Sequence, residues 1–253
     1  MPNHCDHIWG LPSAPPLLGD DEVHVWRARL DVAPARVATL RHTLAADERA
    51  RAERFRFPID RTRSIVARGL LRAIIARYRG GEPGALAFRY NAFGKPALSD
   101  ELDGDGGGIR FNLSHADDIA LFAITRGRAV GVDIERVRAD VTNERVAEQF
   151  FSRREVAALR ALDPCVQPAA FAACWTRKEA YVKARGAGLS IALDQFDVSL
   201  APHEPAALLA SREADEALRP WTLHHLAPDP GYVGAVAVAG GRCRLTCWQW
   251  REQ

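Results

Sequence analysis

The sequence predicts an α+β protein with two similar, pseudo-symmetric lobes, each a small, mostly antiparallel sheet packed with helices. In both halves of the 253 residues, helical patterns are followed by strand patterns. Residues 1–125 contain 17 basic and 16 acidic side chains, and residues 126–253 contain the same numbers. Hydrophobic residues make up 47% and charged residues 26%, as in a globular protein with a core. We therefore expect an N-terminal lobe over 1–125 and a C-terminal lobe over 126–253.

The first lobe is expected to open with a strand and to continue through helices into further strands. Apolar residues alternate over residues 23–30, which indicates a half-buried strand. Residues 39–55 are rich in arginine, alanine and glutamate, and residues 61–78 place apolar side chains on one helical stripe, so both are expected to be helices. The strand-like segments that follow are 88–98, with a turn at Gly94, and 109–113, 119–125 and 129–135.

The second lobe is expected to repeat this order. Ser152 and Glu155 have the spacing of a capping box, which predicts a helix that continues to Leu162. A longer helix is expected over residues 168–185, because Gly186 follows the last helical residue. The predicted strands of this lobe are 196–200, 221–226, 232–239 and 244–250.

Two segments are expected to lack regular structure. Residues 1–20 contain four prolines together with His4, Cys5 and His7. A loose arm that can cover the body of the protein is favoured over a metal site because zinc-type partner ligands do not follow. Residues 99–108 are acidic and rich in glycine, and they indicate a flexible hairpin tip. A phosphate-binding loop is excluded there because neither a Walker lysine nor a helix start follows.

Charge and composition exclude several classes of protein. The net charge of +2 is too small for a protein that mainly neutralises nucleic-acid phosphates. The five cysteines do not form a CxxC pair, which argues against a disulfide framework and a structural zinc site. The sequence has neither a signal-peptide pattern nor an apolar run of membrane-spanning length, so we expect a cytoplasmic protein without membrane contact. We also expect a monomer, because duplication within one chain can complete a cleft.

Two acidic residues alternate with apolar ones in the segment GVDIE. Val130, Val132 and Ile134 would share one face of a strand, while Asp133 and Glu135 would share the other. Two residues along a strand span about 6.6 Å, so both carboxylates can converge on one hard cation such as Mg²⁺. The alternative is that the two acids line a hydrated strand face or pair with nearby arginines.

A further carboxylate and a cation share one face of the long predicted helix. Trp175, Glu179 and Lys183 are spaced four residues apart. Glu179 and Lys183 could form an ordinary surface ion pair. Trp175 on the same stripe indicates instead that this helix face is partly buried. An ion pair without a function is less favourable on such a face.

Two segments contain residue types that bind phosphate. Gly94, Lys95 and Pro96 place an ammonium group beside a rigid turn. Ser114 and His115 add a hydroxyl and an imidazole at the end of a predicted strand. A nucleophile and base pair is excluded because neighbouring strand residues point in opposite directions, and because a G-x-S-x-G elbow is lacking.

Five segments in one order resemble the 4′-phosphopantetheinyl transferases of the Sfp type. The resemblance extends over about residues 44–239 and includes Asp229 to Tyr232. It implies a two-lobed enzyme that holds coenzyme A between its lobes and transfers 4′-phosphopantetheine to a serine of an apo acyl or peptidyl carrier protein. The products would be the holo carrier and 3′,5′-ADP, as in a holo-[acyl-carrier-protein] synthase (EC 2.7.8.7). The segments are GKPAL (94–98), FNLSH (111–115), GVDIE (131–135), FFSRRE (150–155) and WTRKEAYVKARGAGL (175–189).

The resemblance also implies roles for individual residues. Glu179 would be the catalytic base, directly or through a metal-bound water, and Lys183 would stabilise charge at the pyrophosphate. The Mg²⁺ ligands would be Asp133, Glu135 and Glu179. The coenzyme would contact Arg51, Gly94, Lys95, Pro96, Asn112, Ser114, His115 and Lys183.

The sequence departs from the family at Glu48, where a basic residue is often present, so Arg51 is expected to face the 3′-phosphate together with Arg63 and Ser64. Lys178 is expected to point toward the carrier or toward solvent. The carrier could belong to fatty-acid, polyketide or nonribosomal-peptide biosynthesis.

Two other functions stay open at this stage. One is a non-catalytic module that binds coenzyme A or a carrier protein, and the complete set of carboxylates argues against it. The other is a nucleic-acid binder that uses the 11 arginines between Arg41 and Arg79, and it ranks last because the aromatic residues there are not spaced as a stacking platform.

Overall fold

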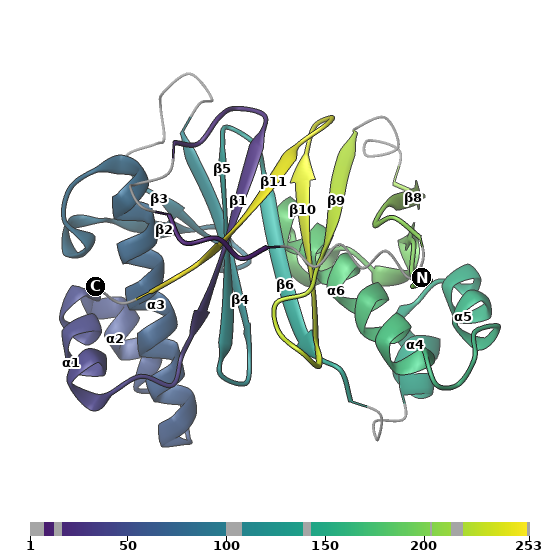
Figure 1. Cartoon of the computed structure of the whole chain (residues 1–253), viewed down its shortest axis with the longest axis horizontal. Coiled ribbons are helices and arrows are strands. Elements are labelled where there is room, and N and C mark those ends of the chain that lie inside the picture. Colours follow the sequence, from purple (N-terminus) through teal and green to yellow (C-terminus); the bar gives the residue numbers. More distant parts are fainter. Residues whose placement is uncertain are drawn as a thin grey trace.

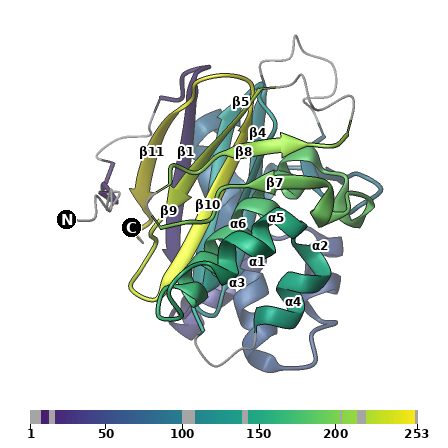
Figure 2. The ribbon, with the colours of Figure 1, turned by 90° about the vertical axis from the view of Figure 1, so that its right-hand side faces the viewer.

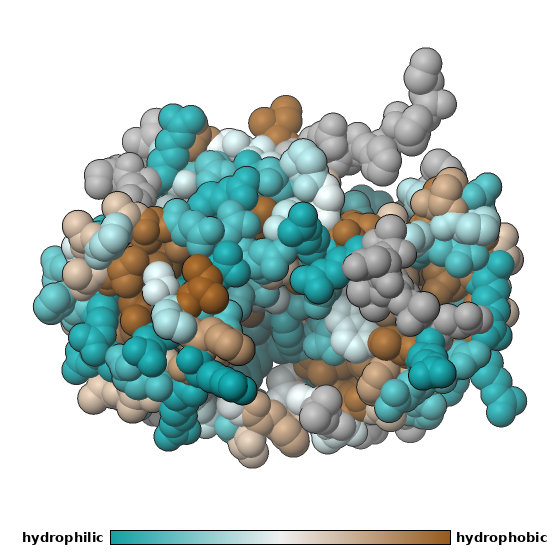
Figure 3. Space-filling view, turned by 90° about the horizontal axis from the view of Figure 1, so that it is seen from below, coloured by the Kyte–Doolittle hydropathy of each residue, from teal (hydrophilic) through white to brown (hydrophobic). Residues whose placement is uncertain are grey.

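The computed structural model describes residues 8–12, 17–99, 108–138, 143–202, 204–213 and 220–251. Two sheets lie in the middle of the molecule, with helices on the outer side of each (Figure 1). The view turned by 90° shows the strands of the two sheets one behind the other (Figure 2). Seen from below, the surface is hollowed between the two halves (Figure 3). The predicted α+β fold with two similar lobes is confirmed.

The first lobe packs three helices on a four-stranded sheet. The sheet has the strand order β11, β1, β5, β4, with Trp26 and Phe122 buried against Leu70 of the covering helix. A two-stranded hairpin, β2 and β3, lies beside it. The bounds are β1 Glu22–Arg29, α1 Pro34–Thr43, α2 Ala46–Ala52, α3 Pro58–Arg79, β2 Phe88–Tyr90, β3 Pro96–Leu98, β4 Ile109–Ala116 and β5 Ile119–Arg126.

The second lobe packs three helices on a three-stranded antiparallel sheet of order β6, β10, β9. The long helix α6 covers this sheet, and Tyr181 packs on Phe196 with a ring-centroid distance of 4.7 Å. The bounds are β6 Val130–Arg136, α4 Asn143–Phe150, α5 Arg153–Arg160, α6 Gln167–Arg185, β7 Phe196–Val198, β8 Leu208–Ser211, β9 Trp221–Leu226, β10 Tyr232–Ala239 and β11 Arg244–Gln249.

The single helix predicted over residues 39–55 is wrong. The structure has α1 and α2 with a break at Leu44 and Ala45, whose backbones are extended. The Glu48 carboxylate accepts the N–H of Ala45 at 2.9 Å and so caps the second helix. Composition favoured helix throughout, and it could not reveal this local cap. Two short elements, α4 and β8, were not predicted at all.

The last strand returns to the sheet of the first lobe. β11 runs parallel to β1, with Trp26 opposite Trp248. Residues 244–249 follow the second lobe in the sequence but lie in the sheet of the first lobe. The division of the chain at residue 125 stays a prediction.

Part of the N-terminal arm packs on the protein. The Trp9 indole N–H donates to the Ala227 carbonyl at 3.1 Å, and Gly10 forms a bridge with Trp248. Residues 8–10 therefore cover part of the body, as expected of this arm. His4, Cys5 and His7, and the expected hairpin tip over 100–107, lie outside the described residues.

Four of the five cysteines lie among the described residues. Cys165 is exposed, Cys174, Cys243 and Cys247 are buried, and all four are free thiols. Within the described ranges, every helix is too short or too polar to span a membrane.

Strand β6 separates the apolar core between the sheets from helix α6. Val130, Val132 and Ile134 pack into the core between the two sheets, as predicted. On the opposite face, Gly131 lies directly beneath α6. A Cβ atom there would come within 2.1 Å of the Ala180 oxygen and 2.3 Å of the Ala184 nitrogen. The helix backbone can rest on the strand only because this side chain is absent.

Lys178 is fully buried, which corrects the expectation that it points toward a carrier or solvent. Its ammonium group lies 2.7 Å from the Glu155 carboxylate and donates to the carbonyls of Leu193 and Phe196. Glu155 also accepts the N–H groups of Ser152 and Val198, both at 2.8 Å. The predicted capping box is confirmed, and it belongs to a buried polar network that joins α5, α6 and β7.

We expect Lys178→Met to lower the free energy of unfolding by about 3–5 kcal/mol, because Glu155 would stay buried without its cation. The double variant Glu155→Gln/Lys178→Met should lose less than the single variant, since neither charge remains. Urea unfolding measured by circular dichroism tests this. An equal or larger loss in the double variant would contradict the role of charge.

We expect Gly131→Ala to destabilise the fold by about 3 kcal/mol or more, because the new methyl group would meet the α6 backbone rather than a movable side chain. Gly127→Ala is not a suitable control, since its φ is +64°. Gly241→Ala is suitable because its Cβ would meet open space. Thermal unfolding of both variants gives the comparison, and similar melting temperatures would refute the close approach as a constraint.

Candidate functional site

Helix α6 and strands β4 and β6 bring three of the predicted site residues together. The Lys183 ammonium group lies 2.6 Å from Asp133 Oδ1 and 3.0 Å from Ser114 Oγ. The Ser114 hydroxyl donates to the same Asp133 oxygen at 2.9 Å. Glu179 lies one helical turn before Lys183 on α6. This geometry follows from the packing of α6 over Gly131, two residues before Asp133.

The acidic residues of the site affect one another electrostatically. Burial, followed by the negative charge of Asp133, raises the pKa of Glu135 to about 7, against the opposing effects of Lys183 and Arg138. Burial and Asp133 also raise the pKa of Glu179. Asp133 thus lies close enough to raise the pKa of both Glu135 and Glu179. Three partly buried carboxylates at one site are energetically costly unless a cation offsets their charge.

We asked whether these residues fit a bound divalent cation. Asp133 Oδ2 is buried without a hydrogen-bond partner. Among the described residues, no group of three His, Cys, Asp or Glu side chains is arranged to hold a metal ion unaided. Mg²⁺ commonly takes one or two carboxylates and completes its shell with water and phosphate oxygens. The unpartnered oxygen and the neighbouring carboxylates therefore fit a cation whose remaining ligands come from outside the protein.

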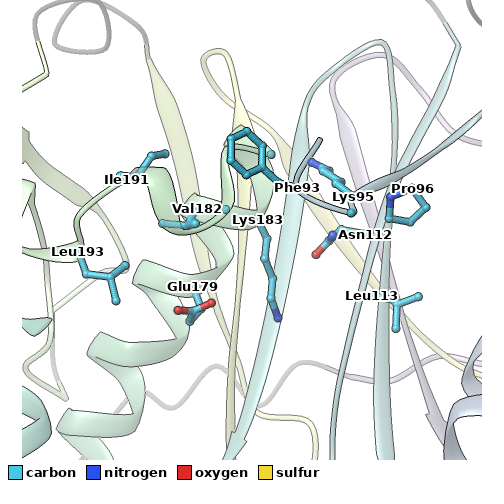
Figure 4. A pocket seen from close by; sticks show the side chains of 13 residues that line it. Phe93, Lys95, Pro96, Asn112, Leu113, Glu179, Val182, Lys183, Ile191 and Leu193 are labelled. Atoms are coloured by element: carbon cyan, nitrogen blue, oxygen red, sulfur yellow. The ribbon is translucent and has the colours of Figure 1, made fainter. Parts of the chain in front are cut away.

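A cavity of about 310 Å³ opens beside Glu179 and Lys183. In Figure 4, Glu179, Val182 and Lys183 border it from α6, and Lys95, Pro96 and Asn112 border it from the opposite side. Gly94 also lines it. Residues predicted from separate segments thus surround one cavity between the lobes.

Lys95 and Asn112 also connect the two lobes. The Lys95 ammonium group donates to the carbonyls of Val130 at 3.0 Å and Ala184 at 2.9 Å. Burial and the positive charge of Arg110 lower the pKa of Lys95 to about 8. The Asn112 side-chain oxygen accepts the N–H of Val132 at 2.9 Å. Both side chains therefore make specific contacts with the second lobe.

His115 projects from the face of β4 opposite to Ser114, as predicted for neighbouring strand residues. Desolvation, and then the positive charges of Lys183 and Arg63, lower the pKa of His115. The imidazole thus lies in a positive field that would favour a bound anion.

Arg51 is not brought to this cavity. Its guanidinium group lies 3.6 Å from the centroid of the Tyr90 ring and 3.4 Å from Asp47. Glu48 is buried and pairs with Arg68 and Arg72, so the departure from the family at this position has a structural role. Arg63 lies 3.3 Å from Asp31.

A second cavity, of about 340 Å³, adjoins Glu135. Its aromatic wall is formed by Phe171 and Trp175, whose rings stack at 6.2 Å with an interplanar angle of 15°. Trp175 is partly buried, as predicted from its place on the stripe with Glu179. Glu135 therefore lines a different cavity from Glu179, and the buried Asp133 lines neither of the two.

Asn91 was missed by sequence reasoning. Its side-chain oxygen accepts the N–H groups of Phe93 and Lys95, and its amide group donates to the Gly186 carbonyl at 2.7 Å. An asparagine two residues before a Phe-Gly turn is typical of an Asx turn, so the local fold could have been predicted. The contact with Gly186, 95 residues away, could not.

Comparisons with known proteins agree with this geometry. A family model described as the 4′-phosphopantetheinyl transferase superfamily matches residues 129–237. A second model, described as 4′-phosphopantetheinyl transferase, N-terminal, matches residues 32–126. Together they extend across both lobes.

Curated relatives match over most of their length. The chain is 41% identical over 245 residues to 4′-phosphopantetheinyl transferase HetI of Nostoc sp. (strain PCC 7120), which covers 96% of this chain and 99% of HetI. It is 30% identical over 196 residues to 4′-phosphopantetheinyl transferase Sfp of Bacillus subtilis, covering 78% of this chain and 82% of Sfp. The chain therefore belongs to the 4′-phosphopantetheinyl transferase superfamily and is of the Sfp type.

Proposed function

We propose that this protein transfers 4′-phosphopantetheine from coenzyme A to a serine of an apo acyl or peptidyl carrier protein, in a Mg²⁺-dependent reaction of the EC 2.7.8.7 class. The observation that carries the proposal is the cluster of Lys183, Asp133 and Ser114 beside Glu179, at the edge of a cavity between the lobes. The names of two relatives, one matching 96% of this chain and the other 78%, support the same reaction.

The reaction forms one bond and breaks one. The serine oxygen of the carrier would bond to the phosphorus that carries the pantetheine arm. The pyrophosphate P–O bond would break, and 3′,5′-ADP would leave with that bridging oxygen. The serine proton would pass to Glu179, directly or through water. A carboxylate at this place, one helical turn before Lys183, can accept the serine proton.

Asp133, Glu135 and Glu179 would hold the Mg²⁺ ion. When bound, the ion supplies positive charge that offsets the charge of the phosphate oxygens. Lys183 now pairs with Asp133, and its side chain is 30% exposed. Its ammonium group is therefore accessible from the cavity and would stabilise the charge that develops as the pyrophosphate bond breaks.

The remaining predicted residues would contact the coenzyme. Ser114 and His115 would face phosphate oxygens, and the positive field around His115 supports that role. Gly94, Lys95, Pro96 and Asn112 line the cavity next to Glu179 and would form its coenzyme-binding wall. Arg51 would need to meet a distant part of the ligand, such as the 3′-phosphate, since it does not line this cavity.

The partner would be an apo carrier protein of fatty-acid, polyketide or nonribosomal-peptide biosynthesis. We propose that the enzyme acts on it in the cytoplasm and as a monomer. The monomer is supported by the cavity, whose two walls both come from one chain. The division into a coenzyme-binding lobe over residues 1–125 and a metal-binding, catalytic lobe over 126–253 belongs to the same proposal.

Incubation with coenzyme A, Mg²⁺ and a panel of apo carriers should add one phosphopantetheine mass to at least one carrier. Glu179→Gln should reduce the rate by about 10²-fold or more, because the amide cannot accept the serine proton. Mass spectrometry of the carrier measures both. Failure to modify any carrier would refute the transferase, and would favour the non-catalytic binding module if coenzyme A still bound.

Lys183→Arg should lower kcat by about tenfold while leaving the Kd for coenzyme A within about threefold of the native value. The planar guanidinium group keeps the charge, but it cannot occupy the compact position of the ammonium group between Asp133 and Ser114. Single-turnover kinetics and calorimetry separate the two quantities. An unchanged kcat would remove Lys183 from the chemistry.

A further inference from the structure

The turn between β2 and β3 caps the C-terminus of α6 from the other lobe. The last carbonyls of a helix lack partners within it, so they need donors from elsewhere. The Ala184 carbonyl receives the Lys95 ammonium group at 2.9 Å, and the Gly186 carbonyl receives the Asn91 amide group at 2.7 Å. An ammonium group at this end also complements the negative pole of the helix dipole.

Asn91 fixes the turn that presents these donors. Its side-chain oxygen accepts the N–H groups of Phe93 and Lys95, both at 2.9 Å. Its backbone N–H donates to the Lys95 carbonyl at 3.0 Å, and its carbonyl accepts the N–H of Gly94 at 3.0 Å. The Asn91 side-chain oxygen therefore stabilises the turn, and its side-chain nitrogen binds the end of α6.

The helix end is shaped to receive the turn. Gly186 is left-handed, with φ of +67°, and a Cβ atom there would lie 3.1 Å from Lys95 Cδ and 3.2 Å from Asn91 Nδ2. Two residues on, a Cβ atom at Gly188 would lie 3.1 Å from the Phe93 side chain. The turn and the segment after α6 therefore fit closely.

Lys95 reaches both elements that carry the proposed catalytic groups. Ala184, whose carbonyl it holds, directly follows Lys183 on α6. Val130, whose carbonyl it also holds at 3.0 Å, starts the strand that carries Asp133. One ammonium group thus ties the first lobe to α6 and to β6 at once, next to the contact between Lys183 and Asp133.

We propose that Asn91 and Lys95 are positioning residues: they clamp the end of α6 and the start of β6 to the first lobe and so fix Lys183 against the cavity between the lobes. The role of the clamp in turnover depends on the proposed transferase function, but its effect on the helix end does not. Two of the three N–H donors of the Lys95 ammonium group are bound to carbonyls of the second lobe, which leaves one for a ligand in the cavity.

Asn91→Asp tests the contact between the lobes most directly. The aspartate oxygen can still accept the N–H groups of Phe93 and Lys95, so the turn is kept, whereas the donor to Gly186 is lost. Lys95→Met removes the ammonium group and keeps most of the stem. Arg89→Ala is the matched control, because Arg89 is an exposed cation on the neighbouring strand β2 and makes neither contact with α6.

Hydrogen exchange without substrates is the first measurement. The amide of Gly186, which bonds to the Val182 carbonyl, should exchange about tenfold faster in Asn91→Asp and in Lys95→Met, and within about twofold of the native rate in Arg89→Ala. Native exchange at Gly186 in Asn91→Asp would overturn the clamp, whether or not the protein is a transferase.

Kinetics on the carrier that the native enzyme modifies are the second measurement. Asn91→Asp should lower kcat by about tenfold, with the Kd for coenzyme A within about threefold, since a misplaced group slows the reaction more than it weakens binding. Lys95→Met should lower kcat as much, and its Kd should rise as well because Lys95 lines the proposed coenzyme-binding wall. A rise of tenfold or more in Kd for Lys95→Met, with native kcat at saturation, would show a phosphate ligand and overturn the positioning role. If the native protein modifies no carrier, the proposed function fails and hydrogen exchange alone decides whether the clamp exists.

Discussion

The contact between α6 and β6 at Gly131 is the constraint on which the site depends. A side chain at this position would overlap the backbone of Ala180 and Ala184, so the glycine lets the helix rest directly on the strand. The same approach brings Lys183 to 2.6 Å from Asp133. A separation larger by the width of a methyl group would break this ion pair and widen the cavity beside Glu179. Both the packing of the helix and the geometry of the site therefore depend on the lack of a Cβ atom at residue 131.

Burial distinguishes the ion pairs that support the fold from the pair that faces the cavity. Lys178 and Glu155 are fully enclosed, and all their contacts hold backbone segments together. Glu48 is enclosed by Arg68 and Arg72 in the same way. Lys183 pairs with a buried aspartate but keeps 30% of its side chain exposed. A cation that can leave its carboxylate for a ligand must remain accessible to that ligand, and among these lysines Lys183 meets the condition.

The two sheets are joined at the site by side chains. Edge strands β4 and β6 belong to different sheets, and Asn112 supplies the acceptor for the N–H of Val132. Ser114 makes the next link, to Asp133, and Lys95 makes a third, to Val130. Side-chain links of this kind leave a gap beside the strands in which a cavity can form, whereas a continuous backbone ladder would close it.

Local patterns in the sequence determined the α+β fold class, most elements, the two faces of β6 and the capping box at Ser152. These features depend on side chains a few residues apart, whose spacing is the period of the strand or helix itself. The tertiary structure alone decided that Lys178 is buried, that β11 joins β1, that Arg51 lies away from the cavity and that Asn91 and Lys95 cap α6. Each of these is a contact between distant segments, and its energy comes from burial and hydrogen bonding that exist only once the chain has folded.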